Sequence, residues 1–260
     1  MEIKILIIVV LLVAASVLYY LITGKSAEGV DQSADATSGT SDKPIILSSA
    51  LRDMQYGRSA SELDCSDSGE DVVTAPWSEF CVAHEHIAAA QNEEAIAVLR
   101  GIVEAPGQEP RSVIWAWELL RSLGVEPRMN QASKLFGVVY EYGAEGGFDI
   151  LSAYADHTVR YFGYAGGGVM WEPADAELLP FVDRLLASAQ QVADLIGVHG
   201  GDDLPDPPEM GRIQLTFLTP GRLRISEGET EVLAADSMSG PVISAAVRLI
   251  SELGRRYDEK

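Results

Sequence analysis

Residues 135–171 read LFGVVYEYGAEGGFDILSAYADHTVRYFGYAGGGVMW. This stretch is rich in β-branched and aromatic residues, which favour strands. Glycines and an Asp156-His157 pair interrupt it at the spacing of short hairpin connections. The pattern therefore predicts four strands, at 135–142, 148–154, 158–164 and 169–171.

The sequence after these strands continues with a helix, a hairpin and a second helix. Apolar residues at helical spacing predict a helix over 175–196, and two short β-rich runs predict a hairpin at 212–218 and 223–226. A final amphipathic helix is expected over 241–256. This order predicts an α+β module at 131–260, in which two helices pack on one face of an antiparallel sheet.

Residues 76–127 have the period of helices instead. We expect a helical hairpin formed by 77–90 and a second helix that starts at Asn92, followed by a third helix from Pro110 to Gly124. The apolar residues of the third helix cover an arc of about 200°, which is wider than one neighbour requires. This helix is therefore expected to lie between the hairpin and the sheet module.

Two tryptophans on this third helix, Trp115 and Trp117, have two interpretations. Aromatic residues in a wide apolar arc usually fill a core. The alternative is that they face a partner or line a ligand groove. Core packing is the prediction, and the partner-facing role is kept as the alternative.

The first 22 residues are expected to anchor the chain in a membrane. Residues 5–22 read ILIIVVLLVAASVLYYLI, without a charge, and a helix of this length spans about 27 Å, close to the thickness of the hydrocarbon layer. A cleaved signal peptide is the alternative, but its apolar region is normally shorter. The charges that flank the segment favour a single-pass anchor with the body outside the cytoplasm. Residues 23–75 are polar and acidic and are interpreted as a flexible linker.

The chain has two cysteines, Cys65 in the acidic stretch and Cys81 in the first helix of the hairpin. Their positions permit a disulfide without requiring one. In the cytoplasm both would be free thiols.

The net charge of −20 limits the partners of the body. Residues 46–260 contain 16 basic and 34 acidic side chains, so most of the acidity belongs to the body. Such a surface repels a phosphate backbone, and the sequence contains no basic patch to offset this repulsion. Nucleic-acid binding is therefore not expected.

Four short stretches carry residue types that are used in catalysis or in metal and nucleotide binding. They are His84-Glu85-His86, the acidic loop with His199, Asp202, Asp203, Asp206 and Glu209, the glycines 163 and 166–168, and Ser237 with Ser239. Histidines at i,i+2 on a helix lie on different faces, and the acidic loop lacks the spacing of an EF-hand. The glycines lack the helix and the lysine of a nucleotide loop, and the serines fit helix capping. We therefore predict no metal site and no cofactor, and no catalytic residues are assigned.

The segments FGVVYEYG, FDILSAYADHTVRYFGYAGGGVMWEP and LTPGRL resemble a family of bacterial membrane-anchored proteins with no known activity. The resemblance covers residues 76–255. The helical hairpin around AAAQNEEAIAVLRGIVEAPG resembles a single tetratricopeptide-type unit, and the strand–helix order after it is loosely similar to profilin-like or roadblock-like domains. This last likeness concerns the fold and implies no activity.

The sequence thus predicts a single-pass membrane protein of the bacterial cell envelope whose body binds or scaffolds another protein. Two alternatives belong to other classes. One is a hydrolase-like enzyme with a dispersed active site near His157 or His199. The other is a sensor domain for a small ligand.

Overall fold

The computed structural model of the chain describes residues 49–56, 65, 75–164, 167–199 and 204–258. All of them belong to one compact unit that begins at Ile45. The predicted membrane span at 5–22 lies outside the described residues. Within the described ranges, no helix is both long enough and apolar enough to cross a membrane.

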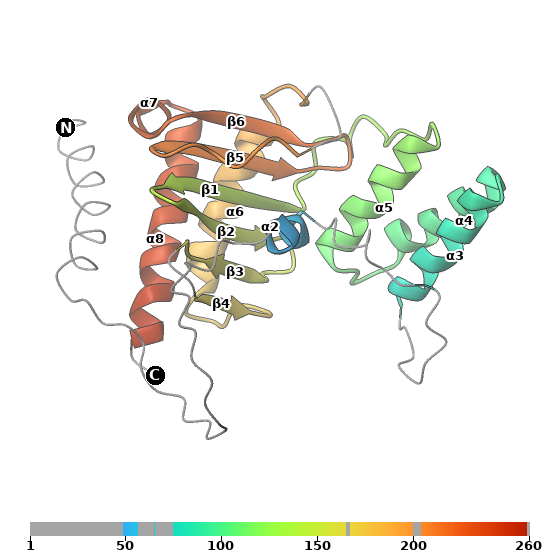
Figure 1. Ribbon diagram of the computed structural model, residues 1–260, viewed down its shortest axis with the longest axis horizontal. Coiled ribbons are helices and arrows are strands. Elements are labelled where there is room, and N and C mark those ends of the chain that lie inside the picture. The colour runs from blue at the N-terminus through green and yellow to red at the C-terminus, as the bar shows by residue number, and fades with distance from the viewer. Residues whose placement is uncertain (1–48, 57–64, 66–74, 165–166, 200–203, 259–260) are drawn as a thin grey trace, which may run out of the picture. The chain divides into compact units, whose positions relative to one another are not determined.

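A six-stranded antiparallel sheet, in the order β4-β3-β2-β1-β5-β6, forms the centre of this unit (Figure 1). The strands are β1 (Gly137–Ala144), β2 (Gly147–Tyr154), β3 (Val159–Phe162), β4 (Gly168–Trp171), β5 (Arg212–Leu218) and β6 (Arg224–Glu229). Strand β1 is paired on both sides, so that Val139 lies opposite Ser152 of β2 and Thr216 of β5. The predicted α+β class and the antiparallel sheet are confirmed.

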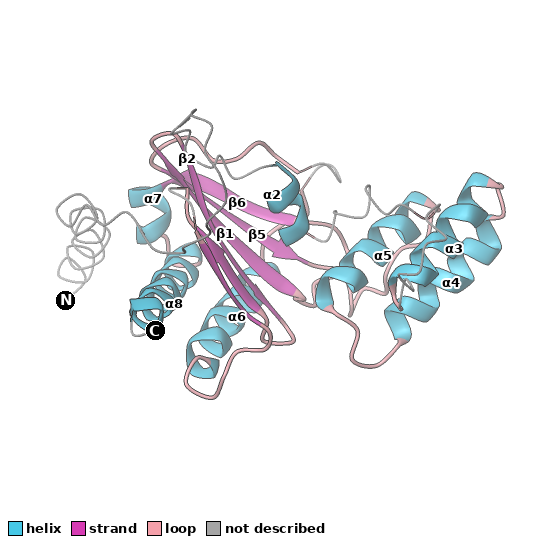
Figure 2. Ribbon diagram, turned by 60° about the horizontal axis from the view of Figure 1, so that its bottom comes forward, coloured by secondary structure: helices cyan, strands magenta, loops and turns pink. Residues whose placement is uncertain are grey.

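Two long helices, α6 (Leu179–Ala193) and α8 (Ser239–Asp258), cover one face of the sheet (Figure 2). Their apolar residues form a single core with the strand residues of that face, such as Val138 and Phe217. Between β6 and α8 lies a short helix, α7 (Thr230–Ala235), which the sequence did not predict.

The opposite face of the sheet carries helix α2 (Ser49–Gln55) (Figure 2). Arg52, Gln55 and Tyr56 are buried there. Two predictions are wrong at this point: residues 49–56 are not a flexible linker, and helices do not cover only one face. The physical reason is that polar side chains of α2 pair with polar side chains that the strands place on this face.

The centre of this pairing is the carboxylate of Glu141 on β1. Arg52 donates from Nε to Oε1 at 2.6 Å and from Nη2 to Oε2 at 2.9 Å, and its Nη1 donates to the carbonyl oxygen of Pro205 at 2.7 Å. Tyr56 Oη and Gln214 Nε2 also donate to Glu141 Oε2, at 2.8 and 2.9 Å. Burial, together with the charge of Glu141, raises the pKa of Tyr56 well above its ordinary value, so this hydroxyl stays a donor.

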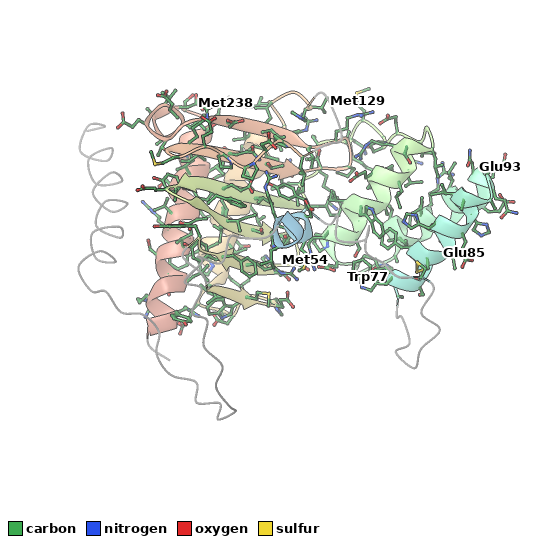
Figure 3. All side chains as sticks on the ribbon, in the orientation of Figure 1. Met54, Trp77, Glu85, Glu93, Met129 and Met238 are labelled. Atoms are coloured by element: carbon green, nitrogen blue, oxygen red, sulfur yellow. A yellow bond between two sulfur atoms is a disulfide. The ribbon has the colours of Figure 1, made fainter. Side chains whose placement is uncertain are left out.

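Three helices precede the sheet in the chain: α3 (Trp77–Ala88), α4 (Asn92–Glu104) and α5 (Pro110–Ser122). The first two form the predicted hairpin, and exposed acids such as Glu85 and Glu93 project from it (Figure 3). The third helix packs on two sides. Trp115 and Leu120 belong to the core of the helices, whereas Ile114 packs with Tyr56 against the sheet. The predicted position of α5 between the two modules is confirmed.

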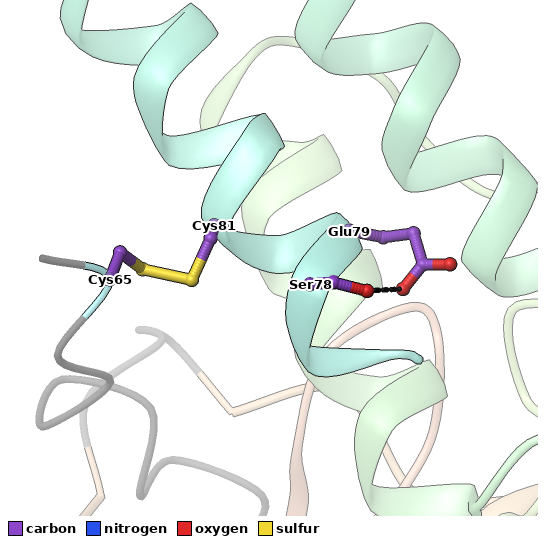
Figure 4. Close-up of a disulfide and its surroundings, with 4 residues drawn as sticks. All are labelled: Cys65, Ser78, Glu79 and Cys81. Carbon is purple, nitrogen blue, oxygen red and sulfur yellow. Dashed lines mark hydrogen bonds between the residues drawn. A yellow bond between two sulfur atoms is a disulfide. The ribbon is translucent and has the colours of Figure 1, made fainter. Parts of the chain in front are cut away.

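A disulfide joins Cys65 to Cys81 of α3, with their Cα atoms 5.5 Å apart (Figure 4). The bond that the sequence permitted is thus present. It attaches part of the segment between α2 and α3 to the first turns of the hairpin, where Ser78 Oγ also donates to Glu79 at 2.9 Å.

Candidate functional site

A cleft of about 420 Å³ opens where the start of α5 meets the end of the hairpin formed by β2 and β3. We call it the charged cleft, because its lining includes Glu109, Arg111, Asp156, Thr158, Arg160 and Glu172. These residues come from separate segments, so the cleft is a product of the tertiary fold.

The start of α5 supplies two of these side chains. Pro110 is the first residue of the helix, where its fixed φ and missing N–H fit the helical geometry. Glu109 therefore stands at the N-cap position and Arg111 in the first turn. This arrangement places a carboxylate and a guanidinium side by side at one wall of the cleft.

The turn between β2 and β3 supplies the floor. The Asp156 carboxylate accepts the backbone N–H of Thr158 at 2.9 Å, and the N–H of His157 donates to the carbonyl of Tyr154 at 2.9 Å. His157 adopts a left-handed conformation with φ 65°, which is uncommon for a residue other than glycine. The carbonyl of His157 accepts the N–H of Ala174, so this turn also positions the chain after β4.

Arg111 is held in place from three directions. Its Nε and Nη2 donate to the carboxylate of Glu109, and its Nη1 donates to the carbonyl of Met54 in α2 at 3.1 Å. The guanidinium also lies over the ring of Tyr154, 5.8 Å from the centroid. Few rotamers remain open to this side chain, so its charge is preorganised.

Arg160 of β3 lies near the same carboxylate. Its Nη2 lies 3.9 Å from Glu109 Oε1, while its Nε donates to Glu172 Oε1 at 3.0 Å and Nη2 contacts the same oxygen. The Arg160 side chain is 11% exposed and that of Glu172 is 51% exposed. The cleft thus contains two constrained cations, and one of them is paired with an acid that reaches into solvent.

This arrangement is suited to binding. The part of the lining that the structure describes contains no Cys, Ser or His to serve as a nucleophile or an imidazole base. His157 lies between two lining residues, Asp156 and Thr158, in the sequence, but it is not part of the lining itself. Its Nε2 lies 3.0 Å from Asp183 of α6. The two arginines and three carboxylates of the lining can recognise a charged group.

The two tryptophans that the sequence singled out are core residues. Trp115 and Trp117 are 7% and 9% exposed. The ring of Trp115 packs against Phe80 at 3.7 Å and against Trp77 at 6.3 Å between centroids. Core packing is confirmed, and the partner-facing alternative is wrong, because the helical hairpin covers this side of α5.

The histidine-containing stretches do not converge on a metal site. His84 packs its ring 5.6 Å from that of Trp115, and His86 Nδ1 lies 2.7 Å from Gln91 Oε1. In the described ranges, no group of three or more His, Cys, Asp or Glu side chains is arranged to hold a metal ion. Residues 200–203 of the acidic loop lie outside those ranges.

On the helix-covered face of the sheet, Asp149 of β2 is half-buried. Its Oδ1 accepts the N–H of Tyr164 at 2.9 Å. Burial raises the pKa of Asp149, although this hydrogen bond and one from Tyr161 oppose the shift. Asp149 thus links the start of β2 to the residues that follow β3.

No protein-family model, curated protein or solved structure matches the chain. The resemblances noted in the sequence therefore stay predictions, and function is inferred from the charged cleft itself.

Proposed function

We propose that the protein is a membrane-anchored binding protein that recognises a segment of another protein of the cell envelope at the charged cleft. One observation carries the proposal. Arg111 and Arg160 face a common cleft, and the carboxylate on Arg160 is half exposed. Arginine is enriched at protein interfaces because its planar fork makes several directed hydrogen bonds.

The energetics favour an exchange of ionic partners in the cleft. Glu172 is half exposed and regains water contacts when it leaves, whereas Arg160 is 11% exposed and needs an incoming acid in its place, so a one-for-one exchange keeps the guanidinium paired. Arg111 needs no rearrangement to meet a ligand, because Met54 and Tyr154 already fix its position. A partner can therefore gain charge-assisted hydrogen bonds without a large cost of ordering.

Two further features support the location. Residues 5–22 have the length and composition of a single membrane span. The disulfide between Cys65 and Cys81 suits an oxidising compartment, which favours a body outside the cytoplasm. The net charge of −20 keeps the body from lying on an anionic lipid surface, so the cleft stays open to a protein partner.

Site-specific photo-crosslinking of the full chain in its membrane tests the proposal. A photoreactive residue at position 172 should form adducts with a partner protein, and Arg160→Gln in the same chain should abolish them. The matched control is position 129 beyond the far end of α5, where Met129 is 94% exposed. The proposal fails if position 172 yields no adduct, if its adducts are those of position 129, or if they persist in Arg160→Gln.

A sensor of small ligands is the second candidate, and the size of the cleft favours it. A volume of about 420 Å³ falls in the range of small-molecule sites, about 300–1,000 Å³. The enzyme alternative has less support, because the His157–Asp183 pair is not part of the cleft lining.

A further inference from the structure

We infer that the charged cleft binds a carboxylate group, which takes the place of the Glu172 carboxylate on the guanidinium of Arg160. The inference rests on the proposed function and names the chemistry of the ligand. The carboxylate can come from a peptide, as its C-terminus, or from a small organic acid.

The two cations of the cleft share one internal carboxylate. Arg111 and Arg160 both lie near Glu109 Oε1, Arg111 in direct contact and Arg160 at 3.9 Å. Arg160 also binds Glu172 through both Nε and Nη2. The cleft thus already holds two carboxylates of its own chain.

The two internal carboxylates, Glu109 and Glu172, differ in how firmly they are held. Glu109 is attached to the first turn of α5 and pairs with both arginines, so it is part of the wall. Glu172 is a residue of the connection after β4, and half of its side chain is exposed. Glu172 is therefore the replaceable occupant, and its position on Arg160 marks where an incoming carboxylate binds.

The charges of the lining favour a ligand with a single negative charge. Three acids in the lining, Glu109, Asp156 and Glu172, oppose the two arginines. A phosphate dianion would meet more like charge than a carboxylate monoanion, at distances where such repulsion costs energy. A planar carboxylate also matches the guanidinium fork with two parallel hydrogen bonds. The cleft therefore favours carboxylate over phosphate.

The test is a titration of the full chain in detergent micelles, with the arginine Nε–H resonances as the readout. The probes are N-acetylglycine, N-acetyl-trialanine with a free C-terminal carboxylate, the same tripeptide as its amide, and inorganic phosphate. Both acids should shift the Arg160 resonance in a saturable way, whereas the amide and phosphate should not. Binding of the tripeptide acid about tenfold tighter than N-acetylglycine identifies a peptide terminus as the source, and equal binding identifies a small acid.

Three variants sharpen the test. Glu172→Gln removes the internal competitor and should tighten acid binding by up to about fivefold, the equivalent of a surface ion pair. Arg160→Gln should weaken binding at least about tenfold, because it removes a charged donor. Glu177→Gln is the matched control, since this exposed acid lies in the same connection between β4 and α6 but pairs with Arg256 and is not part of the cleft lining. It should leave binding unchanged.

The inference is overturned if neither acid gives a saturable shift, if the amide or phosphate binds as well as the acids, or if Glu172→Gln weakens binding. These outcomes are distinct from a failure of the proposed function. In one such outcome, the cross-linking gives adducts at position 172 that depend on Arg160 while the titration shows no preference for carboxylates. That result would support protein binding and contradict the inference about the ligand. Carboxylate binding without a cross-linked protein would keep the inference and move the function to a sensor.

Discussion

The guanidinium of Arg52 donates two hydrogen bonds to the carboxylate of Glu141, at 2.6 and 2.9 Å, although 89 residues separate the two in the chain. Both side chains are buried, and Tyr56 and Gln214 donate to the same carboxylate. This pair fastens α2 to the centre of the sheet, and so positions Met54, whose carbonyl holds Arg111 of the cleft. The charged cleft thus depends on a contact with Met54, which lies 57 residues before Arg111 in the sequence.

Arg52→Met should destabilise the fold by about 3–5 kcal/mol, because it leaves Glu141 as a buried charge without its counterion. Adding Glu141→Gln should recover part of this loss, since glutamine is neutral and still accepts hydrogen bonds from Tyr56 and Gln214. Urea denaturation of the full chain in mild detergent measures both. A double variant no more stable than Arg52→Met would contradict the role given to this pair.

Trp117→Ala should cost about 3–5 kcal/mol, because it leaves a large cavity in the core of the helices. Since α5 also packs on the sheet through Ile114, the wild type and the variant should each unfold in a single thermal transition. Calorimetry provides the measurement. Met129→Ala, at an exposed position, is the control and should change stability by less than about 0.5 kcal/mol. Two resolved transitions would show that the helices and the sheet unfold independently.

Reduction of the disulfide should lower the free energy of unfolding by about 3 kcal/mol, the value expected for a loop with a sequence separation of 16. Urea denaturation with and without a reductant tests this expectation. In a Cys65→Ser/Cys81→Ser variant, the reductant should have no further effect. Equal stability of the oxidised and reduced wild type would show that the bond does not constrain the unfolded chain.

The ion pairs that Glu252 makes with Arg255 and Arg256 within α8 should be lost in acid. Hydrogen bonds from Arg255 and Arg256 lower the pKa of Glu252 to about 2. In the unfolded chain this carboxyl titrates near its model-peptide value of about 4.3, so the unfolded state takes up the proton first. The stability contributed by Glu252 is therefore fully present above that value and is lost as the pH falls towards 2. Carbon-13 NMR of the Glu252 carboxyl should give a midpoint near 2, and a midpoint above 4 would contradict the bonding described.

The elements that the sequence predicted well are those whose signal is local. The buried face of a strand or helix can be read from the spacing of its apolar residues, which lies within a few positions of the chain. Val138 and Leu151 show this for the strands, and Val182 and Leu249 show it for the helices. The start of a helix was predicted well where a proline marks it, as Pro110 does for α5.

Helix α2 was missed because its burial is polar. Arg52, Gln55 and Tyr56 lack the apolar spacing of a packed helix. Their partners include Glu141 and Ser152, which lie 85–97 residues further along the chain. No local pattern reports such pairs.

The charged cleft was missed for the same reason. Glu109, Asp156, Arg160 and Glu172 are ordinary surface types in the sequence, and they become a site only when the start of α5 meets the turn between β2 and β3. The one local signal was Asp156-His157, which was interpreted correctly as a hairpin turn.

The disulfide between Cys65 and Cys81 has a consequence for proteolytic shedding. A protease that cuts the chain between these two cysteines leaves the pieces covalently joined through sulfur. With the proposed membrane span at residues 5–22, such a nick would not free the body from the membrane. Covalent release would then require a cut before Cys65, or a cut between the two cysteines followed by reduction, so we expect detachment to depend on the redox state of the surroundings.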